Sequence, residues 1–224
     1  MSAASKASSS APRSLAVGVT GGIGSGKSQA CRFLESFGAA YLSADIVARD
    51  ILDTDAGLKK SVRKLFGDDV YLESGSLDRK KVARRIFQEP ELKRSLEELV
   101  HPVTLSRIDK EIDRISAQGT HAVIVVEAAL IFEARAELMF DYIVVVDAPE
   151  ESRIARVMER DQVSRHDVLE RMEAQMSVDE KIRRADFVLK NTSDLAAFEQ
   201  NARFLYTLLL SMAHLPHGDD ETQE

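Results

Sequence analysis

The stretch 21–28, GGIGSGKS, constrains the fold of this chain more than any other part of the sequence. It fits the pattern G-x-x-x-x-G-K-[ST], in which glycines let the backbone curl so that its N–H groups point at phosphate oxygens. The apolar run 15–19 before it predicts a buried strand, and apolar residues at helical spacing over 30–37 predict a helix that stops near Gly38. The sequence therefore predicts a strand–loop–helix unit that binds a nucleoside triphosphate.

The residues of this loop have separate expected roles. We expect Lys27 to reach the β- and γ-phosphates and Ser28 to offer its hydroxyl to Mg²⁺. The alternative is a tight glycine turn that only joins a strand to a helix, but the number of fitting positions and the correct flanks favour nucleotide binding. The residues predicted to surround the nucleotide here are Gly22, Ile23, Gly24, Ser25, Gly26, Lys27, Ser28 and Gln29.

Composition excludes several classes of protein. With 224 residues, 44% of them hydrophobic, the chain can bury a core as one domain or as one domain with an insert. The net charge of −7 argues against a general nucleic-acid binder, which needs a basic face. The single cysteine, Cys31, excludes an internal disulfide framework and suits a reducing cytoplasm. No apolar run approaches the roughly 18 residues that span a bilayer.

The two ends differ in composition from the rest of the chain. Residues 1–14 are rich in serine and alanine and lack acids, whereas residues 213–224 are acidic. A transit peptide would share the first composition, but this segment is short and has no amphipathic repeat. We expect both ends to be disordered tails.

The hydrophobic pattern of residues 15–212 predicts an α/β fold with a parallel sheet. Short apolar runs at 15–19, 39–43, 122–127, 141–147 and 187–189 predict about five strands, with helices between them and a final helix over 195–212. Residues 56–118 show only helical periodicity, which predicts a helical insert between the second and third strands. Residues 150–180 form a second helical region that carries several arginines.

Two carboxylates are expected at the carboxyl edge of the sheet, where open α/β sheets bind their ligands. Asp45 follows the second predicted strand, and an equally good interpretation makes it the N-cap of the next helix. Glu127 ends the third predicted strand, and a carboxylate in that place commonly handles Mg²⁺ or its water shell.

Basic residues outside the loop allow two interpretations each. Arg153, Arg156 and Arg160 share one helix face and either pair with nearby acids or stabilise charge during phosphoryl transfer. We favour the second role for Arg160 and favour it less for Arg153. In the insert, Arg79 lies on a helix face that could simply be solvated, and His101 could simply be packed.

Several short stretches resemble the dephospho-CoA kinase family when taken in order. The resemblance covers about residues 15–212. The matching stretches are 20–28, Ser43-Ala44-Asp45, Leu77-Asp78-Arg79, His101-Pro102, 127–133, Arg160-Asp161 and 185–188 with Asn191.

The sequence departs from the family pattern in four places. Ser43 stands where the family has a first aspartate, so only Asp45 can supply the carboxylate of that motif. Glu127 replaces an aspartate and Ala129 replaces a proline, which changes the reach of the carboxylate near the metal. Gln29 stands where threonine often follows the serine of the loop.

The resemblance implies a P-loop kinase that transfers the γ-phosphoryl group of ATP to the ribose 3′-hydroxyl of dephospho-CoA, the final step of coenzyme A biosynthesis. It implies that Asp45 is the base and that Lys27, Arg156 and Arg160 stabilise charge, the two arginines from a lid at about 150–180. The insert would bind the acceptor through Arg79 and His101, and Asn191 would lie near adenine.

The same resemblance implies ATP and Mg²⁺ as cofactors. Composition leads us to expect a cytoplasmic enzyme without a nucleic-acid or membrane partner. We expect a monomer or a small homo-oligomer. A kinase for another small metabolite would keep the glycine loop and the lid, but the Leu-Asp-Arg and His-Pro stretches argue against it. A GTPase switch would need an Asn/Thr-Lys-x-Asp motif, and residues 191–194 lack the lysine.

Overall fold

The computed structural model describes residues 13–213, which contain a five-stranded sheet of order β2-β3-β1-β4-β5. All four pairs of neighbouring strands are parallel. The strands are β1 (Leu15–Gly21), β2 (Ala40–Ser43), β3 (Val123–Glu127), β4 (Tyr142–Asp147) and β5 (Phe187–Lys190). The predicted α/β fold with a parallel sheet is thereby confirmed.

The expected tails fall almost wholly outside the described residues, because residues 1–12 and 214–224 are not described. Ser14 is buried, and its hydroxyl donates to the carbonyl oxygen of His121 at 2.6 Å. The packed part of the chain therefore includes Ser14. Within residues 13–213, none of the helices has the length and apolar character needed to cross a membrane.

Two layers of helices cover the two faces of the sheet. Along β3, Val123 and Val125 point to the face covered by α1 (Lys27–Ser36) and α9 (Leu195–Ala213), while Ile124 and Val126 point to the other face. That second face is covered by the C-terminal half of α5 (Pro90–Gln118), through residues such as Ile108. Alternate residues of a strand face opposite sides, so the continuous apolar run of β3 suits a strand buried on both faces.

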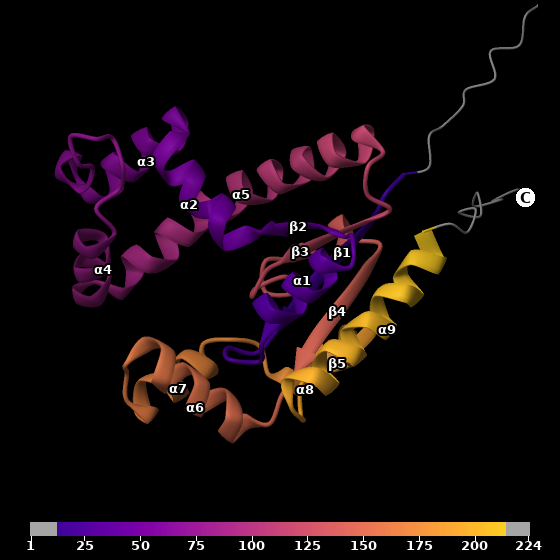
Figure 1. Ribbon diagram of the computed structural model, residues 1–224. Coiled ribbons are helices and arrows are strands. Elements are labelled where there is room, and N and C mark those ends of the chain that lie inside the picture. The colour runs from indigo at the N-terminus through magenta and orange to yellow at the C-terminus, as the bar shows by residue number, and fades with distance from the viewer. Residues whose placement is uncertain (1–12, 214–224) are drawn as a thin grey trace, which may run out of the picture.

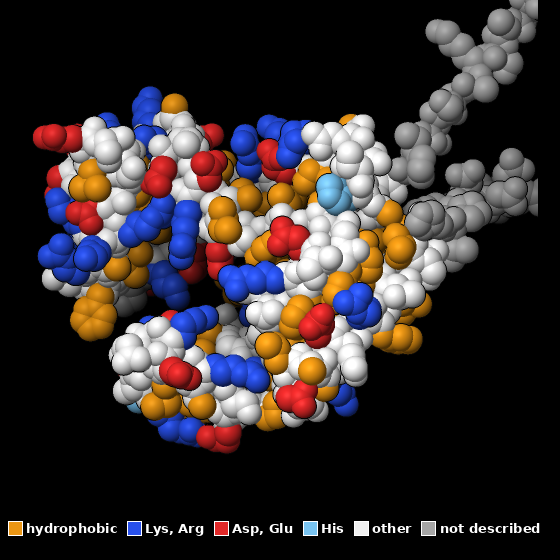
Figure 2. All heavy atoms as spheres, in the orientation of Figure 1, with side chains coloured by type: hydrophobic (Ala, Val, Ile, Leu, Met, Phe, Trp, Pro, Cys, Tyr) orange, Lys and Arg blue, Asp and Glu red, His pale blue; other side chains and the backbone are white. Residues whose placement is uncertain are grey.

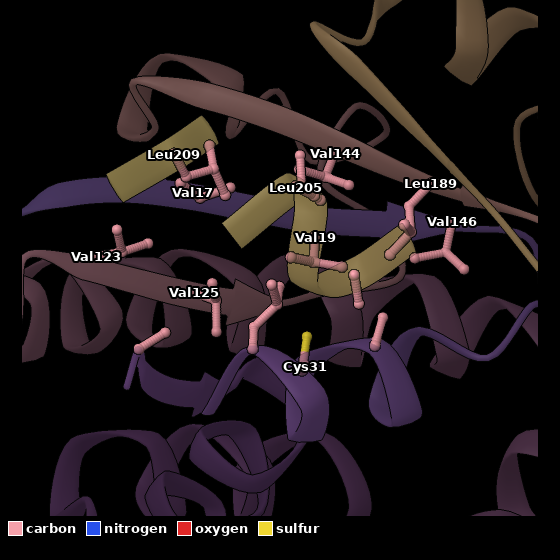
Figure 3. Close-up of a cluster of buried hydrophobic side chains, with 14 of the residues drawn as sticks. Val17, Val19, Cys31, Val123, Val125, Val144, Val146, Leu189, Leu205 and Leu209 are labelled. Atoms are coloured by element: carbon pink, nitrogen blue, oxygen red, sulfur yellow. The ribbon is translucent and has the colours of Figure 1, made fainter. Parts of the chain in front are cut away.

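Figure 3 shows the core beneath α1 and α9, where valines of β1, β3 and β4 meet Leu205 and Leu209 of α9. The sulfur of Cys31 lies in this cluster, and its side chain is fully buried. Burial raises the pKa of the Cys31 thiol well above its usual range. The thiol is therefore a packed apolar group and not a reactive one.

The helical insert has a hydrophobic core of its own. It comprises α3 (Ala56–Phe66), the short 3₁₀ helix η1 (Asp68–Val70), α4 (Arg79–Gln88) and the first part of α5, and α2 (Ala44–Thr54) packs against it. The side chains of Asp55 and Asp78 cap α3 and α4 by accepting backbone N–H groups at 2.7 and 3.0 Å. The buried residues of this core are Ile51, Leu52, Leu58, Val62, Phe66, Val70, Tyr71, Leu77, Val82 and Val100.

The predicted lid, residues 150–180, contains α6 (Glu150–Asp161), α7 (Arg165–Glu173) and the start of α8 (Val178–Arg184). A further 3₁₀ helix, η2 (Glu137–Met139), precedes β4. Ile154, Val157 and Val168 of the lid pack against Ile23 of the glycine loop. Figure 1 shows the insert and the helices α6 and α7 beyond the same end of the sheet, with the insert above and α6 and α7 below in this view. Figure 2 shows the hollow between them, with Lys and Arg side chains on its rim.

Candidate active site

The loop between β1 and α1 depends on glycines for both its conformation and its close contacts. Gly24 and Gly26 have φ values of 75° and 98°, and Gly26 is the N-cap of α1. A Cβ atom added to Gly24 would lie 2.5 Å from the carbonyl oxygen of Arg153, and one added to Gly26 would lie 2.5 Å from Nδ2 of Asn191. Both positions therefore require glycine, and the curled loop brings the N-terminus of α1 to the carboxyl edge of the sheet.

The side chain of Lys27 folds back onto the glycine loop. Its Nζ donates to the carbonyl oxygens of Gly21 and Gly22, each at 3.0 Å. Burial, and to a smaller extent the charge of Lys181, lower the pKa of Lys27 to about 8, although the attraction of Glu127 and Asp45 opposes this shift. The ammonium group is therefore a partly desolvated cation placed beside the backbone of the glycine loop.

Asn191, predicted to bind the nucleotide, supports the loop from the end of β5. Its side chain is buried, and its Nδ2 donates to the carbonyl oxygen of Ser25 at 2.8 Å. This hydrogen bond joins the last strand of the sheet to the glycine loop. The contact with adenine stays a prediction.

The two predicted metal residues lie next to each other. The hydroxyl of Ser28 donates to Oε1 of Glu127 at 2.6 Å, and the hydroxyl of Tyr41 donates to Oε2 of the same carboxylate. Burial and the hydrogen bond to Glu127 raise the pKa of Tyr41 above its usual value. The sequence reasoning missed Tyr41. No local sequence signal indicates it, because the contact depends on the parallel pairing of β2 with β3, which places Ser43 beside Glu127.

These groups fit Mg²⁺. Among residues 13–213 no cluster of three or more Asp, Glu, His or Cys side chains is placed to hold a metal. A metal here would take one carboxylate, Glu127, and one hydroxyl, Ser28. Mg²⁺ is usually bound in this way, by one or two carboxylates together with substrate phosphates and water.

Asp45 faces a cavity of about 250 Å³ between α2, α5 and the segment after β3. It is exposed in the first turn of α2, and the N-cap of that helix is Ser43, whose hydroxyl oxygen accepts from the N–H of Ile46 at 3.5 Å. The capping interpretation of Asp45 is therefore wrong. Within the described part of the chain its carboxylate has no hydrogen-bond partner, yet it is close enough to Lys27 to raise the pKa of that lysine.

The cavity is mostly apolar, and His101 of α5 lines it together with Asp45. The structure thus places His101 and Asp45 on the same cavity, and Asp45 is linked to the glycine loop through its electrostatic interaction with Lys27. Their roles in binding and catalysis stay predictions. Arg79 does not line this cavity, because its guanidinium pairs with Asp53 at 2.8 Å and donates to the carbonyl of Arg49. The apolar side chains of the lining include Leu52, Leu96, Val100, Leu105, Ile108, Ile131 and Phe140.

The three arginines of α6 lie at different distances from the glycine loop. Arg153 is buried, its Nε donates to the carbonyl of Ala148 at 3.1 Å, and a Cβ atom on Gly22 would lie 2.6 Å from its Nη1. Arg156 donates to the carbonyl oxygen of Gly24 at 3.3 Å.

Arg160, the arginine that we favoured most, forms two hydrogen bonds with Asp161 at 2.7 and 3.0 Å. Its side chain is 63% exposed, and Asp161 also pairs with Arg171. In this structure, therefore, Arg153 and Arg156 touch the loop and Arg160 does not.

Lys181 is a second residue that the sequence reasoning missed. It is fully buried in α8, and its Nζ lies 2.8 Å from the carbonyl oxygen of Ala129 and 2.9 Å from Oε1 of Glu133. Sequence alone does not distinguish this lysine from its exposed basic neighbours in the same helix. Glu133, the last residue of the stretch 127–133, could have indicated a buried cation nearby.

Comparison with known proteins gives one consistent result. A family model described as dephospho-CoA kinase matches residues 15–197. A dephospho-CoA kinase of Chlorobium luteolum is 37% identical over 201 residues, which cover 88% of this chain and 91% of that relative. A dephospho-CoA kinase of Salinibacter ruber is 37% identical over 190 residues, which cover 85% of this chain and 95% of that relative.

Solved structures agree with the sequence comparison. The dephospho-CoA kinase of Campylobacter jejuni has a TM-score of 0.62 and 28% identity, and the match covers 87% of this chain and 96% of that one. The protein TT1252 of Thermus thermophilus has a TM-score of 0.72 and 34% identity, and the match covers 89% of this chain and 98% of that one. This chain belongs to the dephospho-CoA kinase family.

Proposed function

We infer that this chain transfers the γ-phosphoryl group of ATP to the ribose 3′-hydroxyl of dephospho-CoA, with Asp45 as the base. The observation that carries this inference is the position of Asp45. Its carboxylate has no hydrogen-bond partner within residues 13–213, it lines the cavity beside α5, and it interacts electrostatically with Lys27. A carboxylate between an acceptor cavity and a phosphate site can orient a hydroxyl and take its proton.

The cavity suits the nucleoside end of the acceptor. Its apolar walls match the flat base of an adenosine group, and His101 and Asp45 supply polar groups at its border. We propose that His101 contacts the acceptor. Arg79 would contact it only if the guanidinium leaves Asp53.

The glycine loop and its surroundings suit the triphosphate. Backbone N–H groups of residues 22–29 and the ammonium of Lys27 would bind the phosphates, and Ser28 with Glu127 would hold Mg²⁺. Bound Mg²⁺ supplies charge neutralisation on the phosphate oxygens. Asn191 would keep the loop in place through its hydrogen bond to the carbonyl oxygen of Ser25, in addition to the predicted contact with adenine.

The arginines of α6 would stabilise the charge of the moving phosphoryl group. Arg153 and Arg156 already contact the loop, so they are placed to act on bound phosphates. Arg160 would take part after exchanging its partner Asp161 for a phosphate oxygen, as the lid helices approach the nucleotide.

We also propose where and in what form the enzyme acts. The single cysteine, buried in the core, suits a cytoplasmic location, and the acidic net charge suits a protein without a nucleic-acid partner. A monomer or a small homo-oligomer would be sufficient for the reaction. The proposed site needs no residue from a second chain.

The test is an ADP-release assay with purified protein, ATP, Mg²⁺ and dephospho-CoA. Adenosine, AMP, pantetheine and shikimate serve as alternative acceptors, and the Lys27→Ala variant measures background ATP hydrolysis. We expect ADP release with dephospho-CoA well above that with every other acceptor. Equal turnover of another acceptor would point to a different small-molecule kinase, and nucleotide binding without turnover of any acceptor would point to a nucleotide switch.

A further inference from the structure

Lys181 carries a charge in the interior of the protein at a place where three segments meet. Its side chain is fully buried, although it belongs to a short helix whose neighbouring basic residue Arg183 is exposed. Lysine is almost never fully buried unless its ammonium is paired. The partners of this ammonium therefore indicate what the residue holds together.

One partner belongs to the acceptor side of the site. The Nζ atom donates to the carbonyl oxygen of Ala129 at 2.8 Å, and the hydroxyl of Thr20 at the end of β1 donates to the same oxygen at 3.2 Å. Ala129 lies in the segment 128–136, which forms one wall of the cavity that contains Asp45. Lys181 and Thr20 thus fix this wall of the cavity by donating to the same carbonyl oxygen.

The other partner belongs to the nucleotide side. The ammonium pairs with Oε1 of Glu133 at 2.9 Å, and this oxygen also accepts the backbone N–H of Met176 at 3.0 Å. Met176 lies in the last part of the lid, which borders a cleft beside Gly22 of the glycine loop. Glu133 therefore joins the cavity wall to the end of the lid, and Lys181 holds Glu133 in place.

The charge of Lys181 also reaches the phosphate site, because it lowers the pKa of Lys27. An ionic pair in the interior is a weak source of stability, since desolvation of the two charges offsets most of their attraction. A buried pair that connects two binding regions has a clearer physical role in fixing their relative positions.

Building on the proposed function, we propose that Lys181 is a positioning residue that couples the two substrates. Through Ala129 and Glu133 it ties the wall of the acceptor cavity to the end of the lid. Movement of the lid onto bound ATP then presses the same wall into the position that binds dephospho-CoA. Occupancy of the nucleotide site consequently increases the affinity for the acceptor.

The test measures that coupling directly. The Kd of dephospho-CoA is determined by calorimetry with and without a saturating non-hydrolysable ATP analogue and Mg²⁺. For the unmodified protein we expect the analogue to tighten acceptor binding by about fivefold or more. In Lys181→Met we expect this factor to fall to about one, whatever change the lost charge causes in the Kd of the analogue alone.

Arg183→Met is the matched control, because it removes the same charge from the same helix at an exposed position. We expect it to keep the full coupling factor. Glu133→Gln is the second variant, since its amide oxygen can still accept from Lys181 and Met176 without the ionic pair. We expect Glu133→Gln to keep part of the coupling, and this variant replaces Lys181→Met in the test if Lys181→Met fails to fold. In the double variant Lys181→Met/Glu133→Gln, we expect no loss of coupling beyond that of Lys181→Met.

The outcomes separate this inference from the proposed function. If Lys181→Met lowers only the melting temperature and keeps the coupling factor, the residue is structural and the inference is wrong. An unmodified protein that phosphorylates dephospho-CoA but shows no coupling also overturns it, and leaves the proposed function intact. If the protein does not turn over dephospho-CoA at all, the proposed function fails first.

Discussion

The two sides of the candidate site hold their polar groups in different ways. On the phosphate side, Lys27, Ser28 and Glu127 each have hydrogen-bond partners within the protein, and the loop between them is fixed by Asn191. On the acceptor side, the Asp45 carboxylate has no such partner in the described part of the chain, and its surroundings are mostly apolar. The polar groups of the first side are fixed by hydrogen bonds within the protein, and the second side keeps one carboxylate free of such bonds.

This difference corresponds to two chemical tasks. A triphosphate has a high charge density, so its site needs cations and dipoles held in a fixed arrangement that needs little reorganisation. An alcohol acceptor has to be oriented and deprotonated, so its site needs shape and one carboxylate that is not already engaged. Variants on the two sides should therefore fail in different kinetic parameters.

The largest effect is expected for Lys27→Ala. The substitution removes the cation that would neutralise the transferred phosphoryl group, in a site where burial strengthens its electrostatic effect. We expect kcat/KM for ATP to fall by about 10³-fold or more in steady-state assays. A fall of less than about tenfold would show that the phosphate side does not depend on this cation.

A smaller and more selective effect is expected for Asp45→Asn. The amide keeps the size of the carboxylate but cannot accept the proton of the hydroxyl, so kcat should fall by about 10²-fold while the KM for ATP stays within about twofold. Asp50→Asn, on the same helix, is the control and should keep the normal rate. Near-normal kcat in Asp45→Asn would remove the proposed base and the contrast between the two sides.

The sequence predicted the phosphate side better than the acceptor side, for a physical reason. Residues 21–28 are contiguous, and their glycines specify the loop conformation locally, so Lys27 and Ser28 could be assigned from the pattern alone. The strands also followed from local apolar runs, and all five lie within a few residues of their predicted bounds. Local sequence is sufficient to predict a loop or a strand whose conformation depends on neighbouring residues.

The remaining contacts join segments far apart in the chain. The bond of Tyr41 to Glu127 and the bond of Lys181 to Ala129 depend on strand order and on helix packing. The preference for Arg160 over Arg153 rested on spacing along the chain, and it stays a prediction. Spacing placed both on one helix face, but only packing shows that Arg153 lies against Gly22.

An intermediate effect is expected for Tyr41→Phe, which sharpens the comparison within the phosphate side. Loss of the hydroxyl frees one oxygen of Glu127, so the carboxylate is less well oriented toward a metal beside Ser28. We expect the apparent affinity for Mg²⁺ to weaken by about tenfold, with little change in kcat at saturating Mg²⁺.

The measurement for Tyr41→Phe is a Mg²⁺ titration of ATP binding by calorimetry, together with the activity titration. Tyr206→Phe is the control, because Tyr206 of α9 packs against Phe37, whereas the hydroxyl that donates to Glu127 is that of Tyr41. If Tyr41→Phe and Tyr206→Phe have the same Mg²⁺ dependence, the hydroxyl of Tyr41 does not orient the metal residue.

The smallest effect is a pH dependence caused by Lys27. Its pKa of about 8 lies below the ordinary value of 10.5, so the cation is present below pH 8 and is lost as the pH rises above it. Bound triphosphate favours the charged form and raises this pKa, so ATP binding at pH 8 should take up about half a proton. Calorimetry in two buffers of different ionisation enthalpy measures the uptake. Lys27→Arg stays charged throughout this range, so proton uptake that persists in this variant would assign the titration to another group.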